Sequence, residues 1–250
     1  LLYPSVADLY ADVQFPEGLV AFFGGLADLT TLEGYLSVEF FSYGALILAV
    51  FAIMAGTAAL AGEEGEGTLD LLLAQPVSRG RLALAKAAAL ALATGLVLLI
   101  TLTFTAASLL VVNVAIGWHS LLLAFALLWL FAVAVALLAM LASLVLPGRK
   151  SAGVLVALVL VASYVVDSLA NLVPELEWTR PLLLIVYYQG DNALTDGVSW
   201  WYTGGLGALL AATLAGVLLL FQRRDVGVQP LWPGRVRPAW RRRGAAPTVE

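Results

Sequence analysis

Long apolar stretches without any charged residue alternate with short polar connections along this chain. These stretches cover residues 40–62, 87–118, 120–148, 151–166 and 197–222. A helix needs about 20 mainly apolar residues to cross the hydrocarbon core of a bilayer. The stretch at 151–166 is short, but it reaches this length if its helix continues through Asp167 to about residue 173. The pattern therefore predicts five membrane-spanning helices, near 38–61, 83–112, 120–146, 151–173 and 200–221.

The composition supports this prediction. Apolar residues make up 62% of the chain and charged residues 12%, whereas soluble domains average about 45–50% and about 25%. An ordinary soluble enzyme and a disordered chain are both excluded. No strand-length alternation of apolar and polar residues suggests a membrane barrel. The expected fold class is all-α, a polytopic membrane helix bundle. Because the chain has no cysteine and one histidine, cysteine nucleophiles are excluded and no metal site is expected. No G-x-S-x-G turn and no partnered base indicates a serine nucleophile, so no catalytic residue is expected either.

The basic residues predict the orientation in the membrane. All 13 lysine and arginine residues except Arg180 flank alternate connections or lie in the C-terminal tail. The positive-inside rule then places 62–82, 147–150 and 222–250 in the cytoplasm. Five spans with a cytoplasmic C-terminus leave residue 1 outside, although no signal peptide is recognisable. We therefore expect residues 1–3 to be the end of a sixth, preceding helix.

Two segments outside the predicted spans have a distinct character. The outer connection at 174–199 contains an apolar run, 181–190, that is too short to cross the membrane, so an interfacial or re-entrant helix is expected there. Residues 229–250 are rich in arginine and proline and are expected to form a basic cytoplasmic tail at the membrane surface.

The cytoplasmic connection at 62–76 is the most informative part of the sequence. It begins with glycines and carboxylates and continues with residues 68–74, which can form about two helical turns. Pro76 ends this piece because proline disfavours the helical conformation at the residue before it. Ser78 is suited to cap a long helix beginning near Arg79. One interpretation is a short surface helix that transmits force from a soluble partner; the alternative is a loop shaped by glycine and proline alone.

This connection resembles the signature of ABC-2-type ABC transporter permeases. In that family an acidic-Gly-Thr-Leu-acidic-Leu-Leu-Leu stretch leads into Pro-Val-Ser-Arg and a later lysine. The matching residues are Glu64, Glu66, Gly67, Thr68, Leu69, Asp70, Leu71, Leu72, Leu73, Pro76, Val77, Ser78, Arg79 and Lys86. Gly34-Tyr35-Leu36 and the Phe-x-x-Arg-Asp sequence at 221–225 also resemble family patterns. The resemblance covers residues 1–228.

The resemblance implies six helices, a cytoplasmic N-terminus and short re-entrant helices on the outer side. It also implies that 62–76 is a coupling helix seated in a groove of a cytoplasmic nucleotide-binding ATPase, which would carry ATP and Mg²⁺. The residues implied at this contact are Glu64, Glu66, Gly67, Thr68, Leu69, Asp70, Leu72, Pro76 and Arg79. A second permease subunit, identical or paralogous, is implied as well. The chain has no phosphate-binding loop of its own, so we do not expect it to be an enzyme.

A few polar residues within the spans are candidates for a translocation pathway. Thr101, Thr105 and Ser108 recur at helical spacing, and Asn113 follows them. Asp167 is the one carboxylate expected within a span, where ionisable groups are functional candidates. Both assignments have a structural alternative. The hydroxyls can bond to their own backbone, and Asp167 can belong to the outer interface.

Taken together, the sequence predicts the permease subunit of an ATP-driven exporter, multi-pass in a bacterial or archaeal cell membrane, with no nucleic-acid partner. An ion- or proton-driven secondary transporter is the first alternative, but it would need paired ionisable groups near the bilayer midplane. A non-transporting membrane scaffold is the second. Apolar drugs, lipids, peptides and ions are all compatible with the composition as substrates.

Overall fold

A computed structural model of the protein describes residues 31–63, 78–113, 116–146, 148–190, 193–194 and 197–223. Within these residues the structure is helical and contains no strand. Five helices are long and apolar enough to cross a membrane. They are Leu32–Gly62, α7 (Arg79–Val112), α8 (Trp118–Val145), α9 (Arg149–Ala170) and α11 (Trp200–Arg223). The predicted fold class and the five predicted spans are confirmed. The predicted tail at 229–250 lies outside the described residues.

The first of these helices is composite. It consists of α3 (Leu32–Tyr35), η1 (Leu36–Ser42), α4 (Tyr43–Thr57) and η2 (Ala58–Gly62), and both η segments are π-helical. A π-helix closes wider turns than an α-helix and often marks a functional site. The two wider stretches lie at opposite ends of α4.

Local signals explain where α7 begins and ends. The Ser78 hydroxyl accepts a hydrogen bond from the Arg81 backbone N–H at 3.4 Å, which confirms the predicted cap. At the other end Asn113 adopts the left-handed conformation with φ of 56°. Asparagine tolerates this conformation, and its backbone N–H satisfies carbonyls of the last turn.

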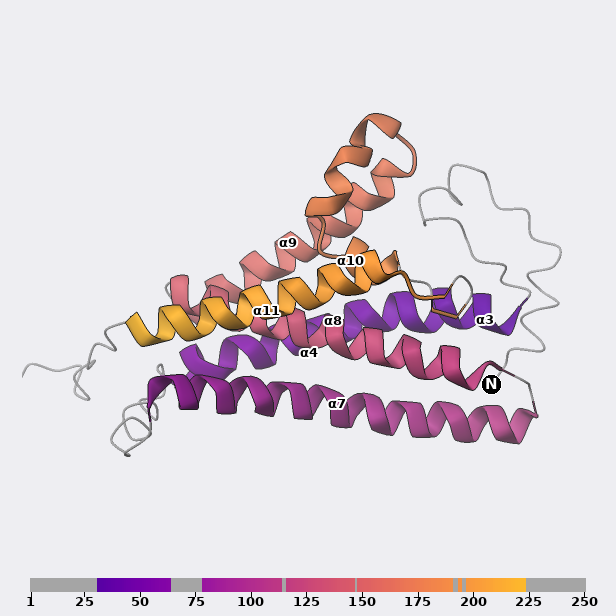
Figure 1. Cartoon of the computed structure of the whole chain (residues 1–250), viewed down its shortest axis with the longest axis horizontal. Coiled ribbons are helices and arrows are strands. Elements are labelled where there is room, and N and C mark those ends of the chain that lie inside the picture. Colours follow the sequence, from indigo (N-terminus) through magenta and orange to yellow (C-terminus); the bar gives the residue numbers. More distant parts are fainter. Residues whose placement is uncertain are drawn as a thin grey trace, which may run out of the picture.

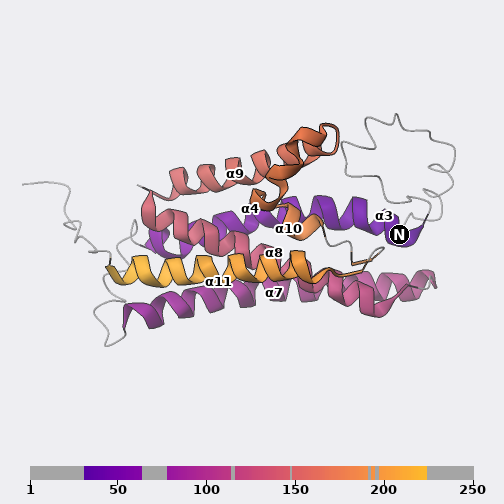
Figure 2. The ribbon, with the colours of Figure 1, turned by 45° about the horizontal axis from the view of Figure 1, so that its top comes forward.

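Helix α8 is the centre of the bundle and packs against α4, α11, α9 and α7. In the most apolar 18-residue stretch of α8, 67% of the residues are buried inside the bundle. In the corresponding stretch of α7, 11% are buried. Figures 1 and 2 show α7 and α9 on opposite sides of the bundle. Phe131, Leu128 and Met140 of α8 are almost fully buried. A single helix therefore supplies much of the core, while α7 turns most of its apolar surface outward.

The crossing of α4 and α8 is very close. A Cβ atom added at Gly56 would lie 2.2 Å from the backbone oxygen of Ala136. Ala45, Ala49 and Ala52 on the same helix are fully buried. Small residues at a helix interface allow two backbones to approach closely, which favours association in lipid.

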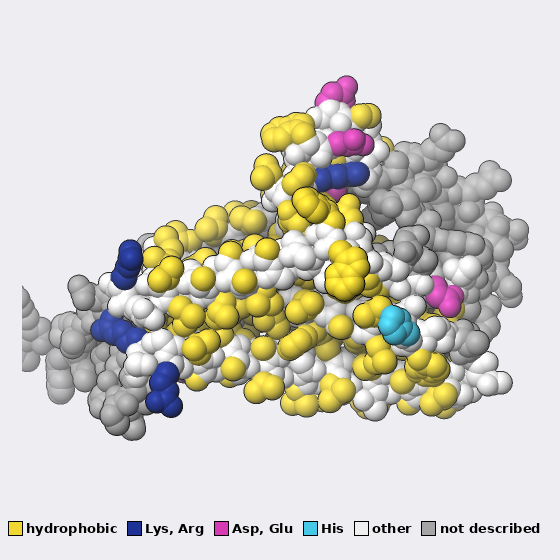
Figure 3. All heavy atoms as spheres, viewed as in Figure 1, with side chains coloured by type: hydrophobic (Ala, Val, Ile, Leu, Met, Phe, Trp, Pro, Cys, Tyr) yellow, Lys and Arg dark blue, Asp and Glu magenta, His cyan; other side chains and the backbone are white. Residues whose placement is uncertain are grey.

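Charged side chains separate to the two ends of the bundle. Most lysine and arginine side chains of the described residues lie at the end where α7 begins and α11 ends, and most aspartate and glutamate side chains lie toward the other end (Figure 3). Arg180, which pairs with Asp167, is an exception at the second end. We name the first the basic end; it carries Arg79, Arg81, Lys86, Arg149, Lys150 and Arg223. The opposite, acidic end carries Glu33, Glu39, Glu175 and Glu177.

Residues 174–190, here named the return segment, leave α9 at the acidic end, project from the bundle and come back to it (Figure 1). The sequence predicts an interfacial or re-entrant helix over 181–190. The structure instead places Pro181 in a 3-10 helix, η3 (Pro174–Leu182), and leaves one α-helical turn, α10 (Val186–Gln189). Leu183 between them is extended, with ψ of 124°. Leu184, Ile185, Val186 and Tyr188 are nonetheless buried, so the segment does enter the bundle.

Candidate functional site

The predicted coupling segment is described only at its two ends. Arg79 lies in the first turn of α7. The other eight predicted contact residues lie outside the described residues; they are Glu64, Glu66, Gly67, Thr68, Leu69, Asp70, Leu72 and Pro76. The segment leaves the first span after Glu63 and joins α7 at Ser78, at the basic end of the bundle.

An ion pair connects these two ends. The Lys86 ammonium on α7 donates a hydrogen bond to the carboxylate of Glu63, which directly follows η2. The two side chains are 24% and 25% exposed. The pair therefore closes the base of the connection between the first span and α7.

Helix α9 also contacts the basic end of α4. The Arg149 guanidinium donates a hydrogen bond to the Met54 carbonyl at 3.3 Å, and the Thr57 hydroxyl donates to the same oxygen at 3.2 Å. Because η2 begins directly after Thr57, the side chains support the backbone where the helix widens. The basic end of the first span is thus held by both α7 and α9.

The predicted pathway residues do not form one group. Thr101 donates its hydroxyl hydrogen bond to the Val97 carbonyl of its own helix at 2.8 Å, as in the structural alternative. Thr105 and Ser108 are half-buried on α7, and Asn113 is an exposed cap at its end. Asp167 lies on α9, on the opposite side of the bundle (Figures 1 and 2). The structure therefore does not bring Asp167 together with the hydroxyls of α7.

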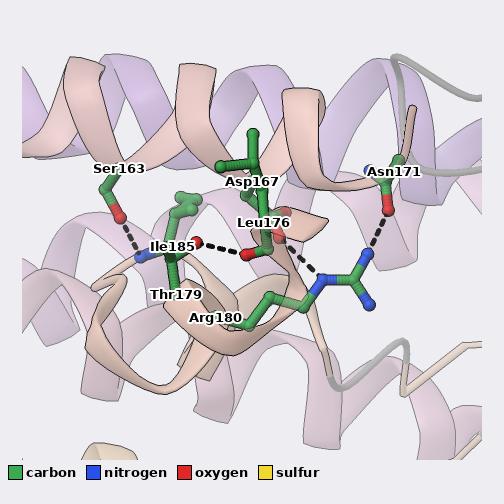
Figure 4. Close-up of polar contacts among 7 residues, drawn as sticks. All are labelled: Ser163, Asp167, Asn171, Leu176, Thr179, Arg180 and Ile185. Carbon is green, nitrogen blue, oxygen red and sulfur yellow. Dashed lines mark hydrogen bonds and ion pairs between the residues drawn. The ribbon is translucent and has the colours of Figure 1, made fainter. Parts of the chain in front are cut away.

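Asp167 belongs instead to a polar stripe of α9 that holds the return segment (Figure 4). Arg180 Nε lies 3.6 Å from Asp167 Oδ1, and the same guanidinium donates a hydrogen bond to the Asn171 side-chain oxygen. One turn earlier on α9, the buried Ser163 hydroxyl accepts a hydrogen bond from the Ile185 backbone N–H at 3.0 Å. Ser163, Asp167 and Asn171 are spaced by four residues, so they share one face of α9.

Tyr188 binds the other end of the return segment to the bundle. Its hydroxyl donates a hydrogen bond to the Phe41 carbonyl in η1 at 3.1 Å. Its ring stacks on Phe131 of α8 with 4.8 Å between ring centroids. A tyrosine hydroxyl is ordinarily protonated at physiological pH, and burial raises the pKa of the Tyr188 hydroxyl further, so the group remains a donor. One side chain thus joins the return segment, the first span and α8.

Helix α11 is shaped to accept the return segment. A Cβ atom added at Gly205 would lie 2.2 Å from the ring of Tyr187. Any larger residue at 205 would therefore displace that ring. The return segment is packed against α9, η1, α8 and α11 at the acidic end.

Comparison with known families agrees with the helical architecture. A model of the ABC-2 family transporter proteins matches residues 14–226. The chain belongs to this family. A search of curated proteins returned no match. The resemblance expected from the sequence is confirmed, and the matched range ends before the predicted basic tail at 229–250. The chain is therefore a membrane component of an ABC-2 transporter, from a permease family that lacks an ATPase domain and in general works with an ATPase partner.

Sequence reasoning missed several residues of this ABC-2 permease that the structure brings together. The sequence indicates Arg180 only as the single basic residue on the predicted outer side, and it gives Glu63 no distinct role. A signal did exist for Arg180, since a lone cation near the one carboxylate expected in a span is a natural partner for it. No comparable signal indicates that Glu63 pairs with Lys86, because the family signature includes Lys86 but not Glu63.

Proposed function

We propose that this ABC-2 permease is the membrane-spanning subunit of an ATP-driven exporter. ATP, with Mg²⁺, would be bound and hydrolysed on a separate cytoplasmic ATPase. Two permease subunits, identical or paralogous, would combine with two ATPases, and the approach of the ATPases would displace the segment at 62–76. The observation that carries the proposal is the position of this signature segment, which joins the first span to α7 at the basic end.

The charge distribution supports a cytoplasmic position for that segment. Arg79, Arg81, Arg149, Lys150 and Arg223 all lie at the basic end. Basic residues flanking spans are retained on the cytoplasmic side of the membrane. The segment would then face the compartment that contains ATP, and the return segment would face outward.

The first span offers a route from the ATPase to the outer face. Its η1 segment contains Phe41, whose carbonyl accepts the Tyr188 hydrogen bond. Glu63, after which the coupling segment starts, directly follows Gly62, the last residue of the span. A tilt or shift of this span at its basic end would move η1 relative to the return segment. That movement would open the bundle between η1 and the return segment at its outer side. Substrate would then leave toward the outside, which is the direction of export.

The coupling contact can be tested with charge reversals in the segment. Glu64→Lys and Glu66→Lys would oppose any basic groups that the ATPase groove presents to them. We expect less ATPase to co-purify with the permease, and less ATP hydrolysis, while the amount of permease in the membrane stays unchanged. Glu177→Lys, at the exposed acidic end, is the matched control and is expected to behave as wild type. Normal co-purification and hydrolysis in both variants would reject this contact.

Ion-driven transport is distinguished by its energy source. Such a transporter would move substrate along an ion gradient without an ATPase. Its coupling site would need ionisable groups near the midplane, whereas Asp167 is paired with Arg180 at the acidic end of α9. The permease is purified from native membranes to decide between the two classes. An associated ATPase supports the ATP-driven exporter, and its absence supports ion-driven transport.

A further inference from the structure

We propose that Glu63 and Lys86 are positioning residues for energy coupling: their ion pair makes the basic ends of the first span and α7 move as one unit when the coupling segment is displaced. This inference rests on the proposed function. It assigns a role to two residues outside the predicted ATPase contact, and it concerns how motion enters the bundle rather than where the ATPase binds.

The position of the pair fits this role. The two residues are 23 apart in the chain. Glu63 directly follows η2, and Lys86 lies in α7 beyond Arg79, which begins that helix. At about 1.5 Å per residue, the lysine is roughly 10 Å inside α7. Every residue from 64 to 77 therefore lies in the loop that the pair closes.

A long connection does not by itself transmit force to both helices it joins. A covalent connection alone leaves the two helices free to shift relative to each other. A cross-link at its base removes that freedom. Displacement of the segment must then shift the first span and α7 together, relative to α8.

The helix ends that carry the pair are packed tightly enough to transmit a displacement of the coupling segment to the rest of the bundle. Leu60 in η2 is 1% exposed. Arg149 holds the Met54 carbonyl from α9. At the start of α7, a Cβ atom added at Gly80 would lie 3.0 Å from the Gln222 side chain of α11. The basic ends of the first span and α7, which the pair joins, are therefore also in contact with α9 and α11.

The burial of the pair sets it apart from ordinary surface ion pairs. Both side chains are about three-quarters buried. Exposed ion pairs contribute little, whereas removal of one partner from a partly buried pair removes an attraction that solvent and salt screen less strongly. Neutralising either residue therefore disturbs the junction, whereas exchanging the two charges preserves the attraction.

The test uses the complete complex, with its co-purified ATPase, reconstituted in lipid. Because the chain has no cysteine, spin labels can be placed at Val111→Cys, at the acidic end of α7, and Leu182→Cys, on the return segment. These positions are 86% and 76% exposed. The measured quantity is the change in distance between the two labels when ATP and vanadate are added. ATP hydrolysis is measured on the same samples.

Glu63→Gln and Lys86→Gln are expected to hydrolyse ATP at the wild-type rate while most of the nucleotide-dependent distance change is lost. The exchanged variant, Glu63→Lys with Lys86→Glu, is expected to restore the change. Lys150→Gln removes an exposed positive charge at the same end of the bundle and is expected to match wild type.

Three results would overturn the inference. The single variants keep the full distance change; the exchanged variant fails to restore it; or hydrolysis, protein yield and distance change all fall together, which indicates a role in folding alone. A wild-type complex without an associated ATPase, or without any nucleotide-dependent change, contradicts the proposed function itself and the role of the pair with it.

Discussion

Tyr188 joins three parts of the molecule through one side chain. Its ring lies on Phe131 of α8, and its hydroxyl reaches the Phe41 carbonyl in η1. The ring contributes apolar packing. The hydroxyl fixes the orientation of the side chain, because burying a donor costs free energy unless the donor finds an acceptor. The sequence places this tyrosine in an apolar run, but its acceptor is 147 residues away. No spacing rule connects two such residues.

Tyr188→Phe removes the hydroxyl and keeps the ring stack. A net hydrogen bond contributes about 0.5–1.5 kcal/mol, so we expect the free energy of unfolding to fall by about 1 kcal/mol. The phenylalanine leaves the Phe41 carbonyl without this donor. Thermal unfolding in detergent measures the effect. The control is Tyr43→Phe, at a side chain that is 44% exposed. Equal unfolding temperatures for the two variants would show that the Tyr188 hydrogen bond is not stabilising.

At the scale of elements, the crossing of α4 and α8 depends on the absence of a side chain at Gly56. Gly56→Ala places a methyl group 2.2 Å from the Ala136 oxygen, which belongs to the backbone and cannot rotate away. Overpacking of this kind costs about 1–3 kcal/mol. Gly44→Ala, on the same helix, meets nothing within 4 Å. We expect Gly56→Ala to lower the unfolding temperature and Gly44→Ala to leave it unchanged or raise it. Two equally stable variants would contradict the close crossing.

The return segment is attached to α9 by polar contacts, so its attachment should be adjustable. Asp167→Asn and Arg180→Gln each remove one charge of the pair that joins them. Partly exposed ion pairs contribute about 0.2–1 kcal/mol. Local opening of residues 174–190 should therefore rise by a factor of roughly 1.4 to 5. Hydrogen exchange of that segment is the measurement, and Glu177→Gln at an exposed site is the control. Unchanged exchange in both pair variants would mean that apolar packing alone holds the segment.

The spans were predictable because hydropathy and length act locally along the chain. Ser78 was predictable as a cap for the same reason. The return segment was not, because its form depends on distant partners. Pro181 favours a break in the helix, but Ser163 on α9 and Gly205 on α11 decide where the segment enters the bundle. The clustering of Asp167 with Arg180 likewise requires knowing that the chain turns back on α9 after residue 170.

At the scale of the whole molecule, the first span connects the Glu63–Lys86 junction at the basic end with the return segment at the acidic end. Its basic end carries Glu63 and contacts Arg149, and its acidic end carries the acceptor of Tyr188. Between them it crosses α8 at Gly56. Helix α8 is the most buried span and α7 the least. A moving first span against a fixed α8 is the arrangement that would carry a displacement from one side of the membrane to the other.

Transmission of a displacement from the ATPase requires that the basic end of the bundle faces the cytoplasm. Since the chain contains no cysteine, single-cysteine variants report which end faces outward. Leu182→Cys, on the return segment, is expected to react with a membrane-impermeant maleimide on intact cells. Lys150→Cys, at the basic end, is expected to react only after the membrane is permeabilised, because basic flanks stay in the cytoplasm. The unmodified chain is the control for background labelling. The reverse pattern would place the coupling segment outside, where no ATP is available to drive it.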